Sequence, residues 1–113
     1  MCIRDSAGAG LGGVLTPTGL GTAIERGKDA LTIDGRRFLL EKPLKADFAI
    51  IKAGKCDKYG NAFAPGSSKN FNLAMAMAAD HVILETGEIV EPGELDPEMV
   101  TYPCVFVDVL VPV

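Results

Sequence analysis

Glycine dominates the sequence just behind the N-terminus. The sixteen residues 7–22 contain six glycines and three threonines. Glycine adopts positive φ angles at little cost and lets a backbone approach a ligand closely, but it loses more conformational entropy on folding than any other residue. Because a plain connection seldom needs glycine at this density, the run indicates a binding loop. A tight structural turn is the alternative interpretation.

Size and charge exclude several classes of protein. With 113 residues, 48% of them hydrophobic and 23% charged, the chain forms at most one compact globular domain. The net charge is -4 and the basic residues are scattered, which argues against a nucleic-acid partner. The apolar stretches are far shorter than the roughly 20 residues that cross a bilayer, so we expect no membrane partner and a cytoplasmic location.

Cysteine and histidine are too few to form a metal centre or a disulfide framework. The three cysteines are Cys2, Cys56 and Cys104, without a Cys-x-x-Cys spacing, and His81 is the single histidine. A zinc site needs about four such ligands at short spacings. We therefore predict no metal ligands.

The first six residues do not fit the rest of the chain. No strand precedes the glycine run, although a ligand loop is normally held by a rigid element at each end. We expect residues 1–6 to be foreign sequence and residues 7–113 to carry the fold.

A β-hairpin is the clearest local structure. Asp34 and Gly35 separate two strand-like segments, Ala30–Ile33 and residues 37–41, and this dipeptide is typical of a two-residue hairpin turn. A short helical turn over residues 22–27 precedes the hairpin. We expect the hairpin to lie at the periphery.

The remaining residues predict an α/β fold. Residues 47–53 are an apolar run typical of a central strand covered on both faces, and residues 54–68 form a structured loop at its carboxyl end. A helix over residues 72–80, capped by Asn72 or Ser68, and a strand over residues 81–85 complete a parallel, right-handed unit. Residues 105–111 predict a closing strand. The expected fold is an open, mostly parallel sheet with flanking helices, and its centre consists of Phe48, Ile50, Ile51, Val82, Leu84 and Phe106.

A set of motifs in a fixed order indicates which protein family the chain resembles. Gly-x-Gly-x-Gly-Gly-x-x-Thr-Pro-Thr-Gly-x-Gly-Thr at residues 8–22 is followed by Leu-Glu-x-Pro-Leu at 40–44 and Asp-Phe-Ala-Ile-Ile-Lys-Ala at 47–53. Asp-Lys-Tyr-Gly-Asn at 57–61, Ser-Lys-Asn-Phe-Asn at 68–72 and Glu-Ile-Val-Glu-x-Gly-Glu-Leu at 88–95 come next. Over residues 7–111 this order resembles the C-terminal half of the A (α) subunit of 3-oxoacid coenzyme A transferases.

The resemblance implies an enzyme of two kinds of subunit, called A and B. Such transferases move coenzyme A from succinyl-CoA or acetyl-CoA to a 3-oxoacid or a short-chain carboxylic acid, in ketone body or short-chain fatty acid metabolism. They work by a ping-pong mechanism, without a metal or a further cofactor, and the nucleophilic glutamate belongs to the B subunit. We therefore assign this chain no catalytic residue and expect three partners: an acyl-CoA, a carboxylic acid and a B subunit.

The resemblance also implies that part of the subunit is missing. The family has a glycine-rich motif near the start of its A subunit, which this chain lacks. We expect the chain to be marginally stable and inactive by itself.

The glycine loop is the predicted wall of the substrate pocket. Gly12 and Gly13 would let the backbone approach the acyl group, Pro17 would stiffen the turn, and the hydroxyls of Thr16 and Thr18 could bond a carboxylate or the pantetheine arm. The predicted pocket residues are Gly10, Gly12, Gly13, Thr16, Pro17, Thr18 and Gly19.

An alternative is a non-catalytic ligand-binding module on a related isomerase or sensor scaffold. Such a module needs basic residues beside the loop to bind phosphate. The nearest cations on the C-terminal side, Arg26 and Lys28, lie beyond its end.

Overall fold

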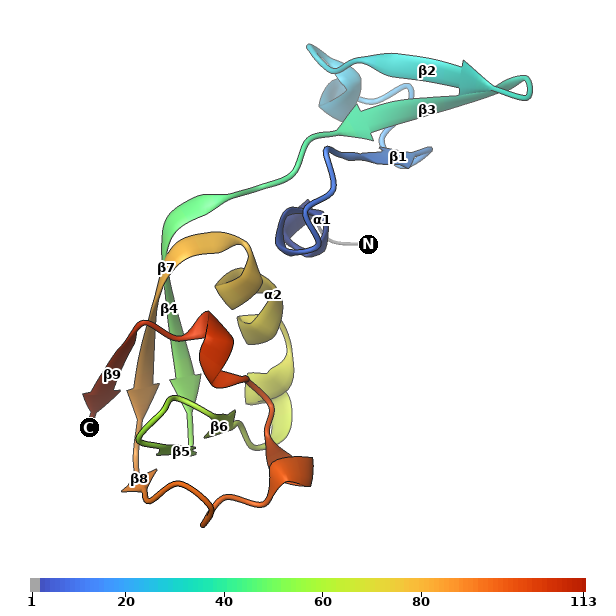
Figure 1. Ribbon diagram of the computed structural model, residues 1–113. Helices are drawn as coiled ribbons and strands as arrows, with labels where there is room; N and C mark the ends of the chain where they lie inside the picture. Colours follow the sequence, from blue (N-terminus) through green and yellow to red (C-terminus); the bar gives the residue numbers. More distant parts are fainter. Residues whose placement is uncertain (1–2) are drawn as a thin grey trace.

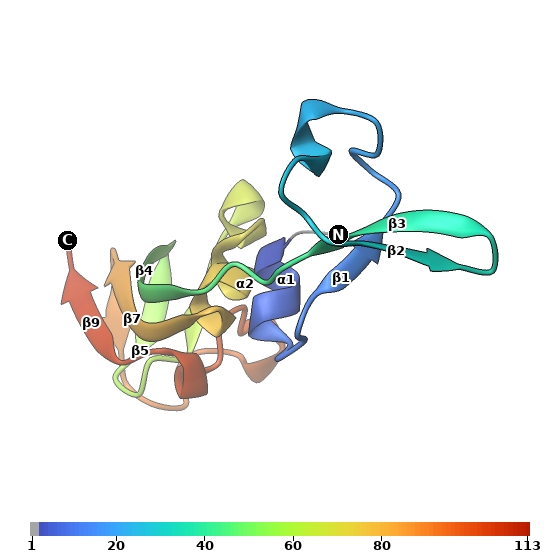
Figure 2. The same cartoon turned by 90° about the horizontal axis from the view of Figure 1, so that it is seen from above.

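The computed structural model describes residues 3–113 and divides into a lobe and a body (Figure 1). The lobe holds β1, β2 and β3, and the body holds the elements from β4 onward. The molecule is elongated, with extents of 56 × 26 × 21 Å. Seen from above, the lobe projects away from the body, with the short helix α1 (Ile3–Gly8) between them (Figure 2).

The lobe is a three-stranded antiparallel sheet of order β1-β3-β2. Its turn residues Asp34 (φ 49°) and Gly35 (φ 75°) both adopt left-handed conformations, as a type I′ hairpin turn requires. The predicted hairpin is therefore confirmed, and so is the helical turn before it, which Thr22 caps by accepting a hydrogen bond from the Ile24 N–H. The elements of the lobe are β1 (Val14–Thr16), η1 (Ala23–Glu25), β2 (Ala30–Ile33) and β3 (Arg36–Glu41).

The body is built on a parallel sheet of order β4-β7-β9. The strands are β4 (Ala46–Ala53), β7 (Ala79–Thr86) and β9 (Val109–Pro112), and α2 (Asn72–Met77) connects the first two. The predicted parallel strand–helix–strand unit and the open α/β fold are confirmed. A smaller sheet of order β6-β5-β8 continues from the carboxyl ends of β4 and β7. It consists of β5 (Lys55–Asp57), β6 (Ala62–Phe63) and β8 (Ile89–Val90), and three short 3-10 helices, η2 (Gly66–Lys69), η3 (Pro97–Met99) and η4 (Cys104–Phe106), lie in the loops.

One register joins the two sheets of the body. Phe48 pairs with His81 in the central sheet and Cys56 pairs with Ile89 in the smaller one, so each residue lies opposite the residue 33 positions later. Three ion pairs follow this register along the surface: Lys52 with Glu85, Lys55 with Glu88 and Lys58 with Glu91. The segments 46–58 and 79–91 thus keep one parallel register across both sheets.

The core lies on one face of the central sheet only. Ala49, Ile51, Val82 and Leu84 are buried there beneath α2 and the segment 104–107. The prediction that β4 is covered on both faces is wrong for the described residues, because Phe48 is 63% exposed and Ile50 is 69% exposed. Both connections, β4 to β7 and β7 to β9, pack against the same core and leave the other face open.

Two predicted boundaries need correction. The helix ends at Met77 because Ala79 already pairs with Ala46 as the first residue of β7. Phe71 occupies the N-cap position, whereas the Asn72 side chain donates to the Lys52 carbonyl at 3.3 Å, so neither Asn72 nor Ser68 caps the helix.

The closing strand is also shorter than predicted, since Cys104–Phe106 forms a 3-10 turn after Pro103. The strand β9 begins only after Asp108, whose carboxylate accepts a 2.7 Å hydrogen bond from the Val82 N–H.

A short helix lies at the N-terminal end of the described chain. In α1 (Ile3–Gly8), Ser6 and Ala7 are buried and the Ser6 hydroxyl donates to the Ile3 carbonyl. Gly8 approaches Met77 of α2 so closely that an added Cβ would lie 2.6 Å from the Met77 Cβ. Met1 and Cys2 lie outside the described residues, and the foreign origin of residues 1–6 stays a prediction.

Candidate functional site

The glycine run is not one continuous loop. A strand, β1, divides it, and β1 pairs with β3 so that Val14 faces Glu41, Leu15 faces Leu40 and Thr16 faces Leu39. A strand of three residues is too short to show a strand period, so β1 has no recognisable signal in the sequence. The pairing fixes the middle of the predicted site to the lobe.

A tight turn follows β1. The Thr16 hydroxyl accepts a hydrogen bond from the Thr18 N–H at 3.2 Å, and the Leu20 N–H donates to the Pro17 carbonyl. Pro17 suits this position because its fixed φ angle favours a turn. The Thr18 hydroxyl is exposed and makes no hydrogen bond within the described part of the chain, so it is available to a ligand.

Gly19 is required by packing. Its φ angle is 91°, and a Cβ there would lie 3.1 Å from Ile24 Cγ2 and 3.5 Å from Leu39 Cδ1. Its carbonyl accepts hydrogen bonds from both the N–H and the hydroxyl of Thr22. Gly19 therefore folds the turn back onto the buried Leu39 of β3.

The three predicted pocket glycines before β1 differ in their surroundings. A Cβ on Gly13 would lie 3.0 Å from the Glu41 carbonyl oxygen, so Gly13 serves the pairing of β1 with β3. Gly10 (φ 70°) and Gly12 are exposed, and a Cβ on either would meet no atom within 4 Å. Because Gly12 has no strained φ angle and no neighbour, nothing inside the lobe requires a glycine at this position.

Two ion pairs lie near the loop. Glu25 accepts a 2.7 Å hydrogen bond from the Gly21 N–H and forms an ion pair with Arg37. Lys28 forms an ion pair with Glu41 at 2.5 Å. These carboxylates hold the loop on the hairpin, and Lys28 is directed at Glu41.

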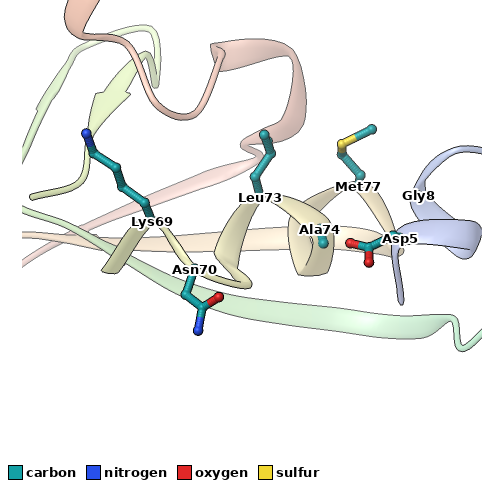
Figure 3. A pocket seen from close by; sticks show the side chains of 7 residues that line it. All are labelled: Asp5, Gly8, Lys69, Asn70, Leu73, Ala74 and Met77. Atoms are coloured by element: carbon teal, nitrogen blue, oxygen red, sulfur yellow. The ribbon is translucent and has the colours of Figure 1, made fainter. Parts of the chain in front are cut away.

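Two cavities lie apart from the predicted pocket residues. The larger, about 320 Å³, lies along η2 and α2 and reaches α1 beside Met77 (Figure 3). The smaller, about 190 Å³, lies beside the base of the hairpin. The larger is lined by Asp5, Gly8, Lys69, Asn70, Leu73, Ala74 and Met77, and the smaller by Gly27, Lys28, Asp29, Leu40, Glu41 and Lys42. Neither includes any of the seven residues predicted to line the substrate pocket.

At the carboxyl ends of the parallel strands, a buried carboxylate organises the loop. Asp57 is 5% exposed and accepts hydrogen bonds from the N–H groups of Tyr59 and Asn61 and from the Asn61 side-chain amide. Asn61 in turn accepts from the Cys104 N–H at 3.0 Å. These bonds make residues 57–61 a structural turn within the predicted loop 54–68.

Two titratable groups are buried near this turn. Burial raises the pKa of the Cys56 thiol, the Asp57 carboxylate adds to the rise, and a hydrogen bond with Thr86 opposes it. Burial also raises the pKa of Tyr102, whose hydroxyl donates a 2.6 Å hydrogen bond to the Ser68 carbonyl. Both groups stay protonated at neutral pH and act as core residues.

Within residues 3–113, no three His, Cys, Asp or Glu side chains are grouped as a metal site would need. The helices in the same range are all too short or too polar to span a bilayer.

Comparison with known proteins identifies the family. The sequence pattern of the family "Coenzyme A transferase" matches residues 1–112. The alpha subunit of the acetate CoA-transferase of Escherichia coli is 52% identical over 101 residues, which are 89% of this chain and 46% of that protein. The A subunit of the 3-oxoadipate CoA-transferase of Acinetobacter baylyi is 50% identical over 99% of this chain and 49% of its own length.

The fold agrees with this match. The crystal structure of glutaconate coenzyme A-transferase from Acidaminococcus fermentans superposes with a TM-score of 0.86 at 18% identity, covering 97% of this chain and 42% of that one. The chain belongs to the coenzyme A transferase family. It corresponds to part of the A type of subunit, as the resemblance indicated, and spans about half the length of the relatives it matches.

Proposed function

We propose that the chain is part of the A subunit of an enzyme that transfers coenzyme A from an acyl-CoA to a carboxylic acid, working with a separate B subunit in the cytoplasm. The observation that carries the proposal is the 50% identity with the A subunit of a 3-oxoadipate CoA-transferase over 99% of the chain. The donor is succinyl-CoA or acetyl-CoA, and the acceptor is a 3-oxoacid or a short-chain carboxylic acid. No metal or further cofactor takes part.

The chemistry follows a covalent ping-pong route. A glutamate carboxylate that belongs to the B subunit first attacks the thioester carbonyl, and the CoA thiolate leaves to give a mixed anhydride. The thiolate then attacks the glutamyl carbonyl, which releases the donor acid as a carboxylate and leaves a glutamyl-CoA thioester. The acceptor carboxylate takes up CoA by the reverse steps and regenerates the glutamate.

The part of this chain is to build one wall of the pocket. Each attack produces an oxyanion and a water-sensitive acyl group, so the site needs hydrogen-bond donors and exclusion of water. The exposed backbone at Gly12 and the exposed hydroxyl of Thr18 offer a close approach and a donor. The opposite wall comes from the B subunit in this proposal.

A rebuilt subunit tests the function. The matched part of the E. coli alpha subunit is replaced by residues 7–113 of this chain, and the hybrid is purified with the partner subunit of that enzyme. We expect CoA transfer from acetyl-CoA or succinyl-CoA to at least one of acetate, butyrate, acetoacetate and 3-oxoadipate. A hybrid that folds and assembles like the unmodified enzyme but transfers CoA to none of these acids would contradict the proposal.

A further inference from the structure

An exposed leucine lies in the segment that joins α1 to β1 (Figure 2). Leu11 is 48% exposed, and its neighbours Gly10 and Gly12 have no side chains that could shield it. A single exposed apolar residue is common on protein surfaces and gives no function by itself. The backbone on both sides of Leu11 and the groups around it provide further evidence.

The end of α1 fixes the backbone before Leu11. The Gly10 N–H donates to the Ala7 carbonyl at 3.1 Å, and the Leu11 N–H donates to the Ser6 carbonyl at 2.9 Å. Gly10 has a φ angle of 70°, in the left-handed region. These bonds and this angle are those of a Schellman motif, in which a glycine follows the helix end. Both acceptors are backbone carbonyls, so the motif does not depend on the side chain at position 6.

The pairing of β1 fixes the backbone after Leu11. Gly13 directly precedes β1, and a Cβ on it would lie 3.0 Å from the Glu41 carbonyl oxygen of β3. Leu11 and Gly12 therefore form a bridge of two residues that is held at both ends. A side chain on such a bridge has a defined position, as a specific contact with a ligand requires.

The bridge also presents a free backbone donor. Gly12 is exposed, and its N–H donates no hydrogen bond to another residue within residues 3–113. An apolar side chain and a free N–H group thus lie on neighbouring residues. They match the two parts of an acyl group with an alkyl chain, because the acyl oxygen accepts the N–H and the chain packs on the leucine.

The charged groups of the lobe favour the same kind of substrate. Lys28 and Arg37 are both engaged, in ion pairs with Glu41 and Glu25. A second carboxylate on the substrate would have to be paired when it is buried, since an unpaired buried charge is costly. Leu11 offers it no charge, whereas it offers an alkyl chain an apolar contact.

We propose that Leu11 contacts the acyl chain of the substrate and determines which acids the enzyme accepts, with short alkyl chains such as that of butyrate preferred over the dicarboxylate 3-oxoadipate. The Gly12 N–H donates to the acyl oxygen in this arrangement. The inference rests on the proposed function, because it takes the glycine loop as a wall of the acyl pocket. It adds the class of substrate and a residue that selects it.

The hybrid enzyme, assembled with the B subunit, tests the selection. With acetyl-CoA as donor, kcat/KM is measured for propionate, butyrate and 3-oxoadipate in the native hybrid and in its Leu11→Ala and Leu11→Arg variants. Leu31→Ala is the matched control, because Leu31 is an exposed leucine on the hairpin.

Leu11→Ala should lower the ratio of kcat/KM for butyrate to that for propionate by about fourfold, the factor that one buried methylene group contributes. Leu11→Arg should raise the ratio for 3-oxoadipate to butyrate by about 10-fold or more, because a guanidinium can pair with the second carboxylate. Leu31→Ala should leave both ratios unchanged. An active hybrid whose ratios do not respond to Leu11, or whose kcat/KM falls by one common factor for all three acids, would overturn the proposal.

Binding measured without chemistry separates this proposal from the proposed function. S-propyl-CoA and S-butyl-CoA are thioethers without a carbonyl group for the glutamate to attack, and calorimetry gives their Kd values. Leu11→Ala should reduce the preference for S-butyl-CoA by about fourfold. A hybrid that transfers CoA to no acid contradicts the proposed function, whereas an equal preference in the native and Leu11→Ala hybrids would overturn the role of Leu11 alone. Failure to bind either thioether would overturn both.

Discussion

Asp57 holds Asn61 by two separate hydrogen bonds, since one carboxylate oxygen accepts from the Asn61 N–H at 3.0 Å and the other from its side-chain amide at 2.8 Å. Because Asn61 accepts from the Cys104 N–H, the pair ties the loop after β5 to the segment before β9. Two stretches 43 positions apart in sequence are thereby fixed to each other.

We predict that Asp57→Ala destabilises the protein by about 2–4 kcal/mol, because three part-buried donors lose their common acceptor. Asn61→Ala should cost less, about 1–2 kcal/mol, since the Tyr59 bond survives. Urea unfolding of the rebuilt subunit measures both. The exposed Asp80→Ala serves as control and should stay within about 0.5 kcal/mol; an equally mild Asp57→Ala would refute the assignment.

Gly19→Ala should destabilise the lobe by about 1–2 kcal/mol, since an alanine at φ 91° is strained and its Cβ meets Ile24. Gly12→Ala is the matched control, because its Cβ meets no atom within 4 Å and its φ angle is unstrained. We expect Gly12→Ala to leave the free energy of unfolding unchanged or slightly higher. Equal losses of unfolding free energy for the two variants would contradict the close packing of Gly19 against Ile24.

The same Gly12→Ala variant separates stability from function. If the backbone at Gly12 approaches the acyl group, the added methyl group should lower kcat/KM of the rebuilt enzyme by about tenfold or more while the melting temperature holds. Unchanged kinetics would remove Gly12 from the pocket.

Thr18→Val should reduce kcat/KM by about 10- to 100-fold through the loss of a hydroxyl that bonds the substrate, without loss of stability. Thr16→Val should instead act through structure, because the Thr16 hydroxyl accepts the Thr18 N–H. Steady-state kinetics and thermal melts of both variants distinguish these roles. A Thr18→Val enzyme with unaltered donor and acceptor kinetics would exclude the hydroxyl from the site.

Alkaline pH should weaken the fold through Cys56. Burial raises the pKa of this thiol in the folded state, so its contribution is complete below the unfolded pKa of roughly 8.5 and is lost as pH rises through the folded pKa. Unfolding free energies measured at about pH 7.5 and about pH 9.5 should fall more for the native protein than for Cys56→Ala. Identical pH dependence of the two proteins would contradict this effect.

Prediction from sequence was correct where the signal lay in neighbouring residues and failed where the structure depends on contacts between distant segments. Asp34 and Gly35 determine their own turn, so the hairpin was correctly predicted from two residues. The end of α2 depends instead on where Ala79 meets Ala46, a contact between distant segments, and the prediction placed it three residues too late. The apolar composition of β4 correctly indicated a strand of a parallel sheet, but cover on both faces was wrongly predicted for Phe48 and Ile50.

The candidate site was likewise predictable only in part. The glycine content indicated the exposed loop. The order of the motifs indicated the family, and the matches confirm that family. The division of the run by β1 was missed because its pairing with Leu39, Leu40 and Glu41 is a tertiary contact. The role of the seven loop residues in substrate binding stays a prediction.

The constant spacing of 33 positions between partners has an evolutionary and engineering consequence. Residues added to or removed from the stretch 59–78 change that spacing but leave every Lys–Glu contact intact, because both paired segments keep their own lengths. A single deletion at Gly54, by contrast, displaces Lys55 and Lys58 from Glu88 and Glu91 at once and turns the outward side chains of β5 inward. Length variation among homologous chains should therefore accumulate between the two paired segments and be absent within them.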